Sequence, residues 1–295
     1  MSQMHLGVFV LGTGHHVSAW KLPDSWGNAE DLSLLQHVAK TAERGKFDLI
    51  FFADALNTGP TVHPSMMVRL EPLTLLSALA MTTRHIGLAA TASATYSEPY
   101  NLARLFASLD HISGGRAAWN VVTGAFPEAA LNFSRDHHPP HAQRYASATE
   151  FVQVAKGLWD SWDDGAIVMD KREGRFADTS RMHVLDHKGE FYTVKGPLNI
   201  SRPPQGHPVI IQAGASDAGR ALAASIAEIV FAVQQDLNAA KAFRADLREL
   251  ASQSGRNPDH MKVMPGVSPI IGETEADAKA KLAMLVEMMD PKSAL

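Results

Sequence analysis

Short apolar runs alternate with longer amphipathic stretches along most of this chain, and this order constrains the fold more than any other feature. The apolar runs predict strands at residues 5–11, 47–54, 86–91, 116–123, 209–213, 229–233 and 263–271. The amphipathic stretches predict helices at 29–44, 72–82, 99–111, 142–162, 218–227, 238–253 and 275–289. Strands that alternate with helices form a parallel sheet. Because these strands are apolar on both faces, we expect helices on the outside of that sheet.

Seven strand–helix units in series predict the α/β class and a TIM (β/α)8 barrel that lacks its last β/α unit. A doubly wound open sheet is the competing architecture. We expect residues 1–295 to form one domain, since α/β barrels of this length are common. The missing unit would mean either that the sequence is a fragment or that another segment covers the gap.

Residues 163–208 interrupt the alternation after the fourth predicted helix. They are rich in charge, glycine and proline, and a hairpin is expected from residues 182–185 and 191–194, joined by a turn at 186–190. Long segments of this kind are either solvated excursions or functional loops, so a lid over the barrel mouth is the alternative.

Composition excludes several classes of function. The formal charge of −4, without a basic run, argues against nucleic acid and anionic membrane as partners. The absence of cysteine excludes disulfides, thiolate catalysis and zinc–thiolate sites. Met1–His5 shows no signal-peptide pattern, and no apolar run is long enough for a membrane span. We therefore expect a cytoplasmic protein.

Two motifs that would indicate other chemistry are incomplete. The glycines Gly12 and Gly14 begin a dinucleotide fingerprint, but Val17 stands where its third glycine belongs. The histidines at 15–16 and 137–141 lack the spacing and the matching carboxylate of a zinc site. The sequence therefore predicts no metal.

The turn that begins at Gly214 is the best candidate for binding a phosphate. Gly214, Ala215 and Ser216 follow a buried apolar run and open a predicted helix. The first N–H groups of a helix lack internal partners, the macrodipole is positive there, and Ser216 adds a hydroxyl donor. The same residues would also serve as an ordinary helix N-cap.

Several segments, taken in order, resemble the bacterial luciferase-like superfamily. In particular they resemble the two-component flavin monooxygenases that include nitrilotriacetate monooxygenase component A and dibenzothiophene sulfone monooxygenase. The segments that carry the resemblance are residues 51–54, 71–80, 90–93, 98–104, 108–116, 119–123, 141–145 and 214–220.

The resemblance implies a barrel that takes FMNH2 from a separate NAD(P)H:FMN reductase. Reduced flavin and O2 would form a C4a-(hydro)peroxyflavin that oxygenates a small organic substrate, in a homo-oligomer. The residues matching the family's flavin contacts are Asp54, Thr91, Asn120, His141, Tyr145, Gly214, Ala215 and Ser216. His141 would be the catalytic, proton-handling residue. The alternatives are a non-catalytic flavin-binding barrel and an oxidoreductase that uses the deazaflavin coenzyme F420.

Each of these residues also has a structural interpretation. Asp54 could cap a loop, and Tyr145 could belong to the apolar stripe of its helix. Asn120 and Thr123 cannot both point into the barrel unless the strand ends between them, and we prefer Asn120. The candidates for an apolar pocket wall are Phe9, Phe52 and Trp119, although core packing explains each of them equally well.

Overall fold

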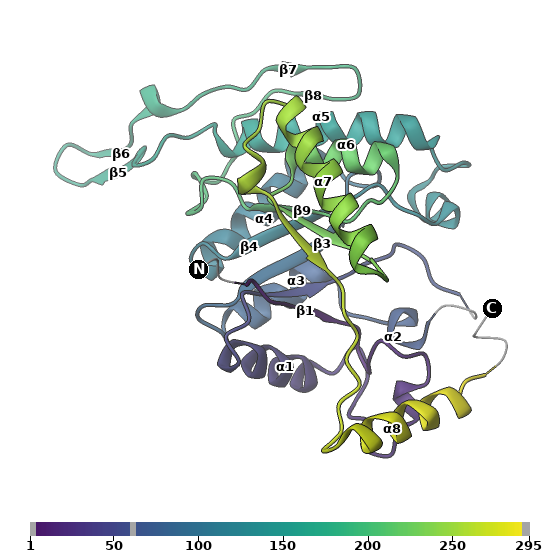
Figure 1. Ribbon diagram of the computed structural model, residues 1–295. Coiled ribbons are helices and arrows are strands. Elements are labelled where there is room, and N and C mark those ends of the chain that lie inside the picture. Colours follow the sequence, from purple (N-terminus) through teal and green to yellow (C-terminus); the bar gives the residue numbers. More distant parts are fainter. Residues whose placement is uncertain (1–3, 60–62, 291–295) are drawn as a thin grey trace.

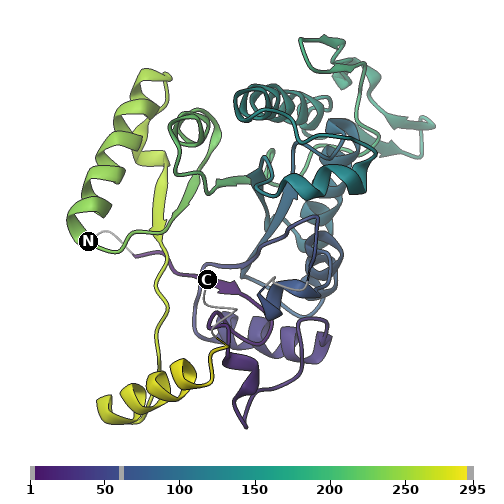
Figure 2. The same ribbon diagram turned by 90° about the vertical axis from the view of Figure 1, so that its right-hand side faces the viewer.

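The computed structural model describes residues 4–59 and 63–290, which form a nearly closed barrel surrounded by helices (Figures 1 and 2). The structure does not describe residues 1–3, residues 60–62 in the loop after the second strand, or residues 291–295. The barrel strands are β1 Gly7–Val10, β2 Leu49–Phe52, β3 Gly87–Ser93, β4 Ala117–Val122, β9 Val209–Gln212, β10 Ile229–Ala232 and β11 Lys262–Pro265. Each of the seven predicted strands is confirmed, mostly with shorter bounds.

The strands follow one another around the sheet in chain order, β1-β2-β3-β4-β9-β10-β11, and every neighbouring pair is parallel. A doubly wound sheet would reverse its order partway, so that alternative was wrong. The two ends of the sheet curve toward each other. The ring of Phe9 on β1 lies 5.8 Å from that of Phe231 on β10, an edge-to-face contact across the barrel interior.

All seven predicted helices are present, with one further short helix, α2. The helices are α1 Leu32–Arg44, α2 Pro64–Met67, α3 Pro72–Ala80, α4 Pro99–Ser113, α5 His141–Trp159, α6 Asp217–Ile226, α7 Leu237–Gln253 and α8 Glu275–Glu287. Proline at the first position and a carboxylate N-cap explain where α3 begins, since Glu71 accepts from the N–H groups of Leu73 and Thr74. Gly114 ends α4 in the left-handed conformation that glycine adopts easily.

Side chains alternate between two apolar layers along each strand. Phe51, Ala89 and Ile211 pack inside the barrel, and Phe9 packs against them. Phe52 and Trp119 belong to the other layer, between the sheet and the helices. The Trp119 ring lies 5.7 Å from that of Phe151 on α5. Of the three candidates for a pocket wall, therefore, only Phe9 points into the barrel, because a strand turns successive side chains to opposite faces.

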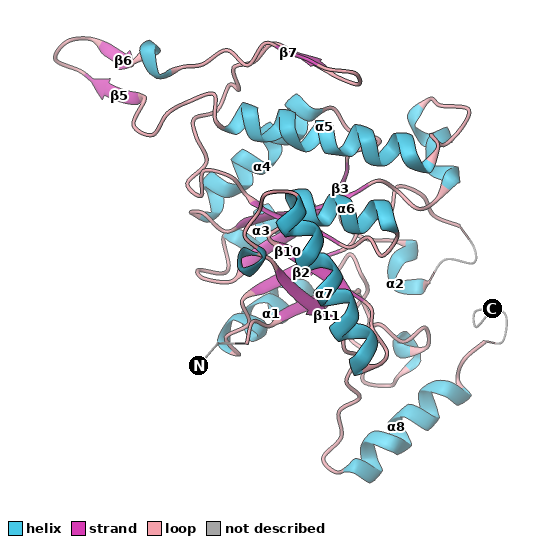
Figure 3. Cartoon of the chain, turned by 45° about the horizontal axis from the view of Figure 1, so that its top comes forward, coloured by secondary structure: helices cyan, strands magenta, loops and turns pink. Residues whose placement is uncertain are grey.

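The segment between α5 and β9 contains two hairpins. The first, β5 Ile167–Asp170 with β6 Arg175–Ala177, projects away from the barrel (Figures 1 and 3). The second, β7 His187–Lys188 with β8 Thr193–Val194, lies where the sequence predicts a hairpin, but its first strand occupies residues expected to form the turn. Short 3-10 helices complete the fold at Ala19–Lys21, Pro127–Phe133, Thr179–Arg181 and Pro258–His260. Among the described residues, no helix combines the length and apolarity required to cross a bilayer.

Candidate active site

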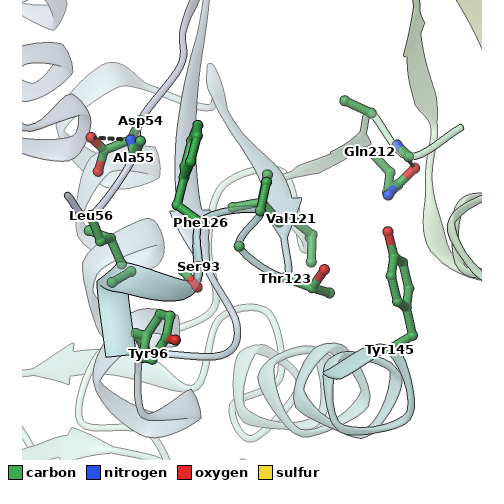
Figure 4. Close-up of a pocket in the computed structure, with 16 residues that line it drawn as sticks. Asp54, Ala55, Leu56, Ser93, Tyr96, Val121, Thr123, Phe126, Tyr145 and Gln212 are labelled. Atoms are coloured by element: carbon green, nitrogen blue, oxygen red, sulfur yellow. Dashed lines mark hydrogen bonds between the residues drawn. The ribbon is translucent and has the colours of Figure 1, made fainter. Parts of the chain in front are cut away.

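A cavity of about 260 Å3 opens at the carboxyl ends of the strands, where α/β barrels carry their active sites (Figure 4). It is lined by residues 54–56 after β2, Ser93 and Tyr96 around the end of β3, residues 121–126 at the end of β4, Ala129, residues 212–214 at the end of β9, and Tyr145 of α5. None of these comes from residues 163–208, so the lining gives no support to a lid in that segment.

Asp54 places a carboxylate at the cavity wall, two residues after β2. Its Oδ1 accepts from the Ala55 N–H at 2.9 Å and from Nε of Arg69 at 3.0 Å. Both side chains are largely buried, at 16% and 15% exposure. Burial raises the pKa of the Asp54 carboxyl, and the Arg69 guanidinium opposes that rise. The ion pair therefore helps to keep a carboxylate in an apolar strand end.

Thr91 and Asn120 form a polar pair inside the barrel. They are direct neighbours in the β3–β4 register, and Asn120 Nδ2 donates to Thr91 Oγ1 at 2.9 Å. Asn120 is 3% exposed, and its Oδ1 is buried with no partner among the described residues. An acceptor in that position is costly unless a ligand supplies a donor.

Thr123 lines the cavity (Figure 4), whereas Asn120, the residue preferred from the sequence, is not among its lining residues. Strand β4 ends at Val122, so the chain leaves strand geometry before Thr123. The two side chains therefore need not follow the alternation of one strand, and the preference for Asn120 as a flavin contact stays a prediction.

His141, Tyr145 and Ser216 gather where α5 and α6 begin. His141 is the exposed first residue of α5, and its ring lies 4.7 Å from that of Tyr145. Its Nε2 is 3.5 Å from Oγ of Ser216. Tyr145 reaches the cavity, where its hydroxyl faces the end of β9 near Gln212 (Figure 4). The structure thus brings together three residues that are up to 75 positions apart.

The Gly214 turn forms a tight cradle before α6. Ser216 is the N-cap, and its Oγ accepts from the Gly219 N–H at 3.1 Å. A Cβ on Gly214 would lie 2.8 Å from Gly219 Cα and 2.6 Å from Gln212 Nε2, so only glycine fits. Ala215 is exposed between them. The N-cap interpretation is therefore confirmed, and phosphate binding at the same helix start stays a prediction.

Sequence reasoning missed several polar residues of this region, namely Arg69, Tyr96, His138, Arg144 and Gln212. Gln212 had a detectable signal, because a polar residue that ends an apolar barrel strand lies at the active rim. Tyr96 lines the cavity from a loop, and the other three contact lining residues from loops or from α5; no local pattern marks any of them. No three metal-ligating side chains gather anywhere in the described ranges.

Comparison with known proteins identifies the family. The luciferase-like monooxygenase family model matches residues 4–294. The chain belongs to this family. It is 52% identical over 294 residues to N-acetyl-S-(2-succino)cysteine monooxygenase of Bacillus subtilis (strain 168), covering 99% of this chain and 67% of that relative. It is 46% identical to nitrilotriacetate monooxygenase component A of Aminobacter aminovorans, covering 98% of this chain and 67% of the relative.

Solved structures of this luciferase-like family agree with the fold. A crystal structure of riboflavin lyase, with a modified FMN and riboflavin as substrate, has a TM-score of 0.92 and 31% identity. It covers 99% of this chain and 68% of that one. This chain therefore spans about two thirds of the length of these relatives. The barrel and its family were both predicted from the sequence, and both are confirmed.

Proposed function

We propose that the chain is an FMN-dependent monooxygenase that receives reduced FMN from a separate flavin reductase and oxygenates a small organic substrate. Family membership supports the reaction class. The observation that carries the cofactor assignment is the convergence of the Gly214 turn, Tyr145 and His141 at one end of the barrel cavity. A cytoplasmic homo-oligomer remains part of the proposal, on the family resemblance alone.

The phosphate of FMN would bind at the start of α6. The free N–H groups and the positive end of the helix dipole favour an anion there. Gly214 lets the chain approach closely, and the Ala215 N–H would be available at the same turn. The hydroxyls of Ser216 and Tyr145 would add neutral donors, so the phosphate is held without a dedicated cation.

The flavin ring would occupy the cavity, over the carboxyl ends of β2–β4. The unpartnered Oδ1 of Asn120 fits a ring N–H as its donor, with Thr91 holding the amide in orientation. Asp54, fixed by Arg69, would line the same side. These are the polar groups that orient a flavin in an otherwise apolar pocket.

Reduced flavin, when bound, would supply the reactivity toward O2. The residues of this chain would control the surroundings of the flavin. His141 would hold a proton at Nε2, the nitrogen that faces Ser216, and so serve as the proton-handling residue. The apolar lining contributed by Leu56, Val121 and Phe126 would exclude water from the reacting atoms.

Anaerobic titration with FMN, reduced FMN and F420 tests the cofactor assignment. We expect reduced FMN to bind most tightly, and Ser216→Ala to weaken its binding about tenfold, the equivalent of ~1.4 kcal/mol for a lost phosphate hydrogen bond. Ser180→Ala, which changes an exposed serine outside the cavity, is the matched control. Tighter binding of F420, or equal affinity of the two serine variants for FMN, would contradict the proposal.

An activity assay with a flavin reductase tests the proposed oxygenation reaction. A reductase, NAD(P)H, FMN and candidate amines, sulfones and thioethers should give an oxygenated product whose added oxygen derives from O2. If reduced FMN binds and no candidate is oxygenated, the non-catalytic flavin-binding alternative gains support.

A further inference from the structure

The cavity has two differently built sides. Tyr145 and Gln212 lie on the side of α5 and β9, whereas Tyr96 lies near Leu56 and Ser93, across the cavity from them (Figure 4). The first side carries the proposed flavin-phosphate contacts. The Tyr96 side has no role in those contacts, so its side chains need another explanation.

Tyr96 is held firmly in its place. It is 9% exposed, and its ring stacks on that of Phe133 at 4.8 Å with an interplanar angle of 24°. Its hydroxyl forms a 2.5 Å hydrogen bond with Nδ1 of His138. Burial and the charge of Arg144 lower the pKa of His138, which favours the neutral imidazole.

Two guanidinium groups flank this wall. The Arg135 guanidinium lies 5.4 Å from the centre of the Tyr96 ring. Arg144, on α5, donates to the carbonyl oxygens of Thr123 at 3.2 Å and of Gly124, two residues that line the cavity. Burial raises the pKa of the Tyr96 phenol, while both arginines oppose that rise, so their field reaches the hydroxyl.

This positive charge has no compensating acid at the cavity. Among the described residues, neither Arg135 nor Arg144 lies in an ion pair with a carboxylate. The one carboxylate that lines the cavity, Asp54, is already paired with Arg69. Glu128, which acts weakly on His138, is exposed. Neither arginine lines the cavity itself, and Arg135 is exposed, so their charge acts on the cavity from beside Tyr96 and residues 123–124. Positive charge next to a partly enclosed pocket concentrates anions.

We propose that the Tyr96 wall, made of Tyr96, His138, Arg135 and Arg144, is the substrate side of the cavity and selects substrates that carry a carboxylate. The inference rests on the proposed monooxygenase function and names its substrate class. Arg135 and Arg144 would neutralise the carboxylate. The Tyr96–His138 pair is the positioning element that keeps the Tyr96 ring at the cavity, with the Arg135 guanidinium beside the ring.

Calorimetric titration of the flavin-free chain tests the proposed preference for carboxylates. The probes are N-acetyl-S-(2-succino)cysteine and nitrilotriacetate, each as the free acid and as the full methyl ester, which keeps the scaffold and removes the charge. We expect at least one acid to bind the native chain at least tenfold more tightly than its ester. Arg135→Met should remove most of that difference and leave ester binding unchanged.

Arg172→Met is the control, because it also removes one positive charge from a side chain that is 93% exposed on the projecting hairpin. It should retain the preference for the acid. Equal binding of acids and esters by the native chain, or equal loss in both arginine variants, would overturn the proposal. Titration of the native chain and both variants with reduced FMN distinguishes failure of the proposed function from failure of carboxylate selection. If none of the three proteins binds reduced FMN, the proposed function is wrong, whether or not the acids bind.

Discussion

Polar side chains around the cavity occur in pairs that join segments far apart in the chain. Asp54 pairs with Arg69, Asn120 with Thr91, and Tyr96 with His138. Each pair offsets the cost of removing polar atoms from water. Three atoms of these pairs are buried with no partner among the described residues: Arg69 Nη1, His138 Nε2 and Asn120 Oδ1. The amide oxygen of Asn120 is an acceptor that lacks a donor, and a ligand N–H would satisfy it.

The Gly214 cradle gives a prediction at this scale. Gly214→Ala places a methyl 2.8 Å from Gly219 Cα, a backbone atom that cannot move aside without shifting the start of α6. We expect reduced-FMN binding to weaken at least tenfold, because the N–H groups would no longer converge on one point. Fluorescence titration measures this. Gly45→Ala, at the end of α1 and outside the cavity, is the control, because its φ of −75° suits any residue and a Cβ there would meet no atom closer than 3.4 Å.

His138 gives a second prediction, on pH. Burial and the charge of Arg144 lower its pKa below the ordinary value of 6.5 for histidine, while the backbone of Gly124 and the charge of Glu128 oppose them. The folded state therefore binds this proton less readily than the unfolded state, so the contribution to stability is present above about pH 6.5 and is lost as the pH falls. Melting temperatures between pH 7.5 and 5.5 should fall more steeply for the native chain than for His138→Gln, which keeps an acceptor for Tyr96. Parallel curves would show that His138 is not responsible.

At the scale of the elements, single carboxylates fasten loops by accepting backbone N–H groups. Glu43 of α1 accepts from the N–H groups of Arg84, His85 and Ile86 before β3. Glu150 of α5 accepts from the N–H groups of Phe191 and Tyr192 and contacts His187 Nε2 at 2.9 Å. In both cases these bonds lower the pKa of the carboxyl against the effect of burial, so the ionised form holds the loop.

Glu150→Gln tests this fastening. An amide has one acceptor oxygen in place of two, so the β7–β8 hairpin should lose about 1–2 kcal/mol of docking free energy. Limited proteolysis should cut at residues 186–192 several-fold faster than in the native chain. Gln153→Glu, on the exposed side of the same helix, is the control for a change at α5. Unchanged cleavage would mean that the contact of Tyr192 with Ser147 suffices to hold the hairpin.

At the scale of the whole molecule, the strength of the barrel varies around its circumference. β3 and β4 pair over six residues, and each has a second neighbour. Within the described residues, β1 and β11 are the ends of the sheet, and each pairs on one side. Backbone groups at such edges are protected by fewer interactions.

Hydrogen exchange should follow this gradient. We expect amides of β3 and β4 to exchange at least tenfold more slowly than those of β1 and β11, because their opening requires breaking two ladders. Mass spectrometry of peptides from the four strands measures the rates. Equal protection of β1 and β3 would contradict the prediction and indicate that β1 is covered on its second side.

Much of the fold was predictable, because local sequence patterns indicate where strands and helices begin and end. Strand position follows from apolar runs, and helix starts follow from features such as Pro72 with Glu71. The site was predictable in part. The interior direction of Asn120 follows from period-two alternation, but the place of Thr123 in the cavity lining depends on the strand ending one residue earlier. Phe52 and Trp119 show the same limit, because the sequence cannot say which face of a doubly covered strand is the cavity.

By itself, the sequence determined the barrel, its strand order, the Gly214 turn with its Ser216 cap, and membership of the luciferase-like monooxygenase family. Those features depend on propensities and contacts between residues close along the chain. Only the tertiary structure decided that Arg69 pairs with Asp54, that His138 holds Tyr96, and that Arg144 reaches the end of β4. The partners in these contacts are 15 to 42 residues apart in the chain. The curvature of the barrel determines which loops meet over the cavity, and no local sequence pattern predicts that curvature.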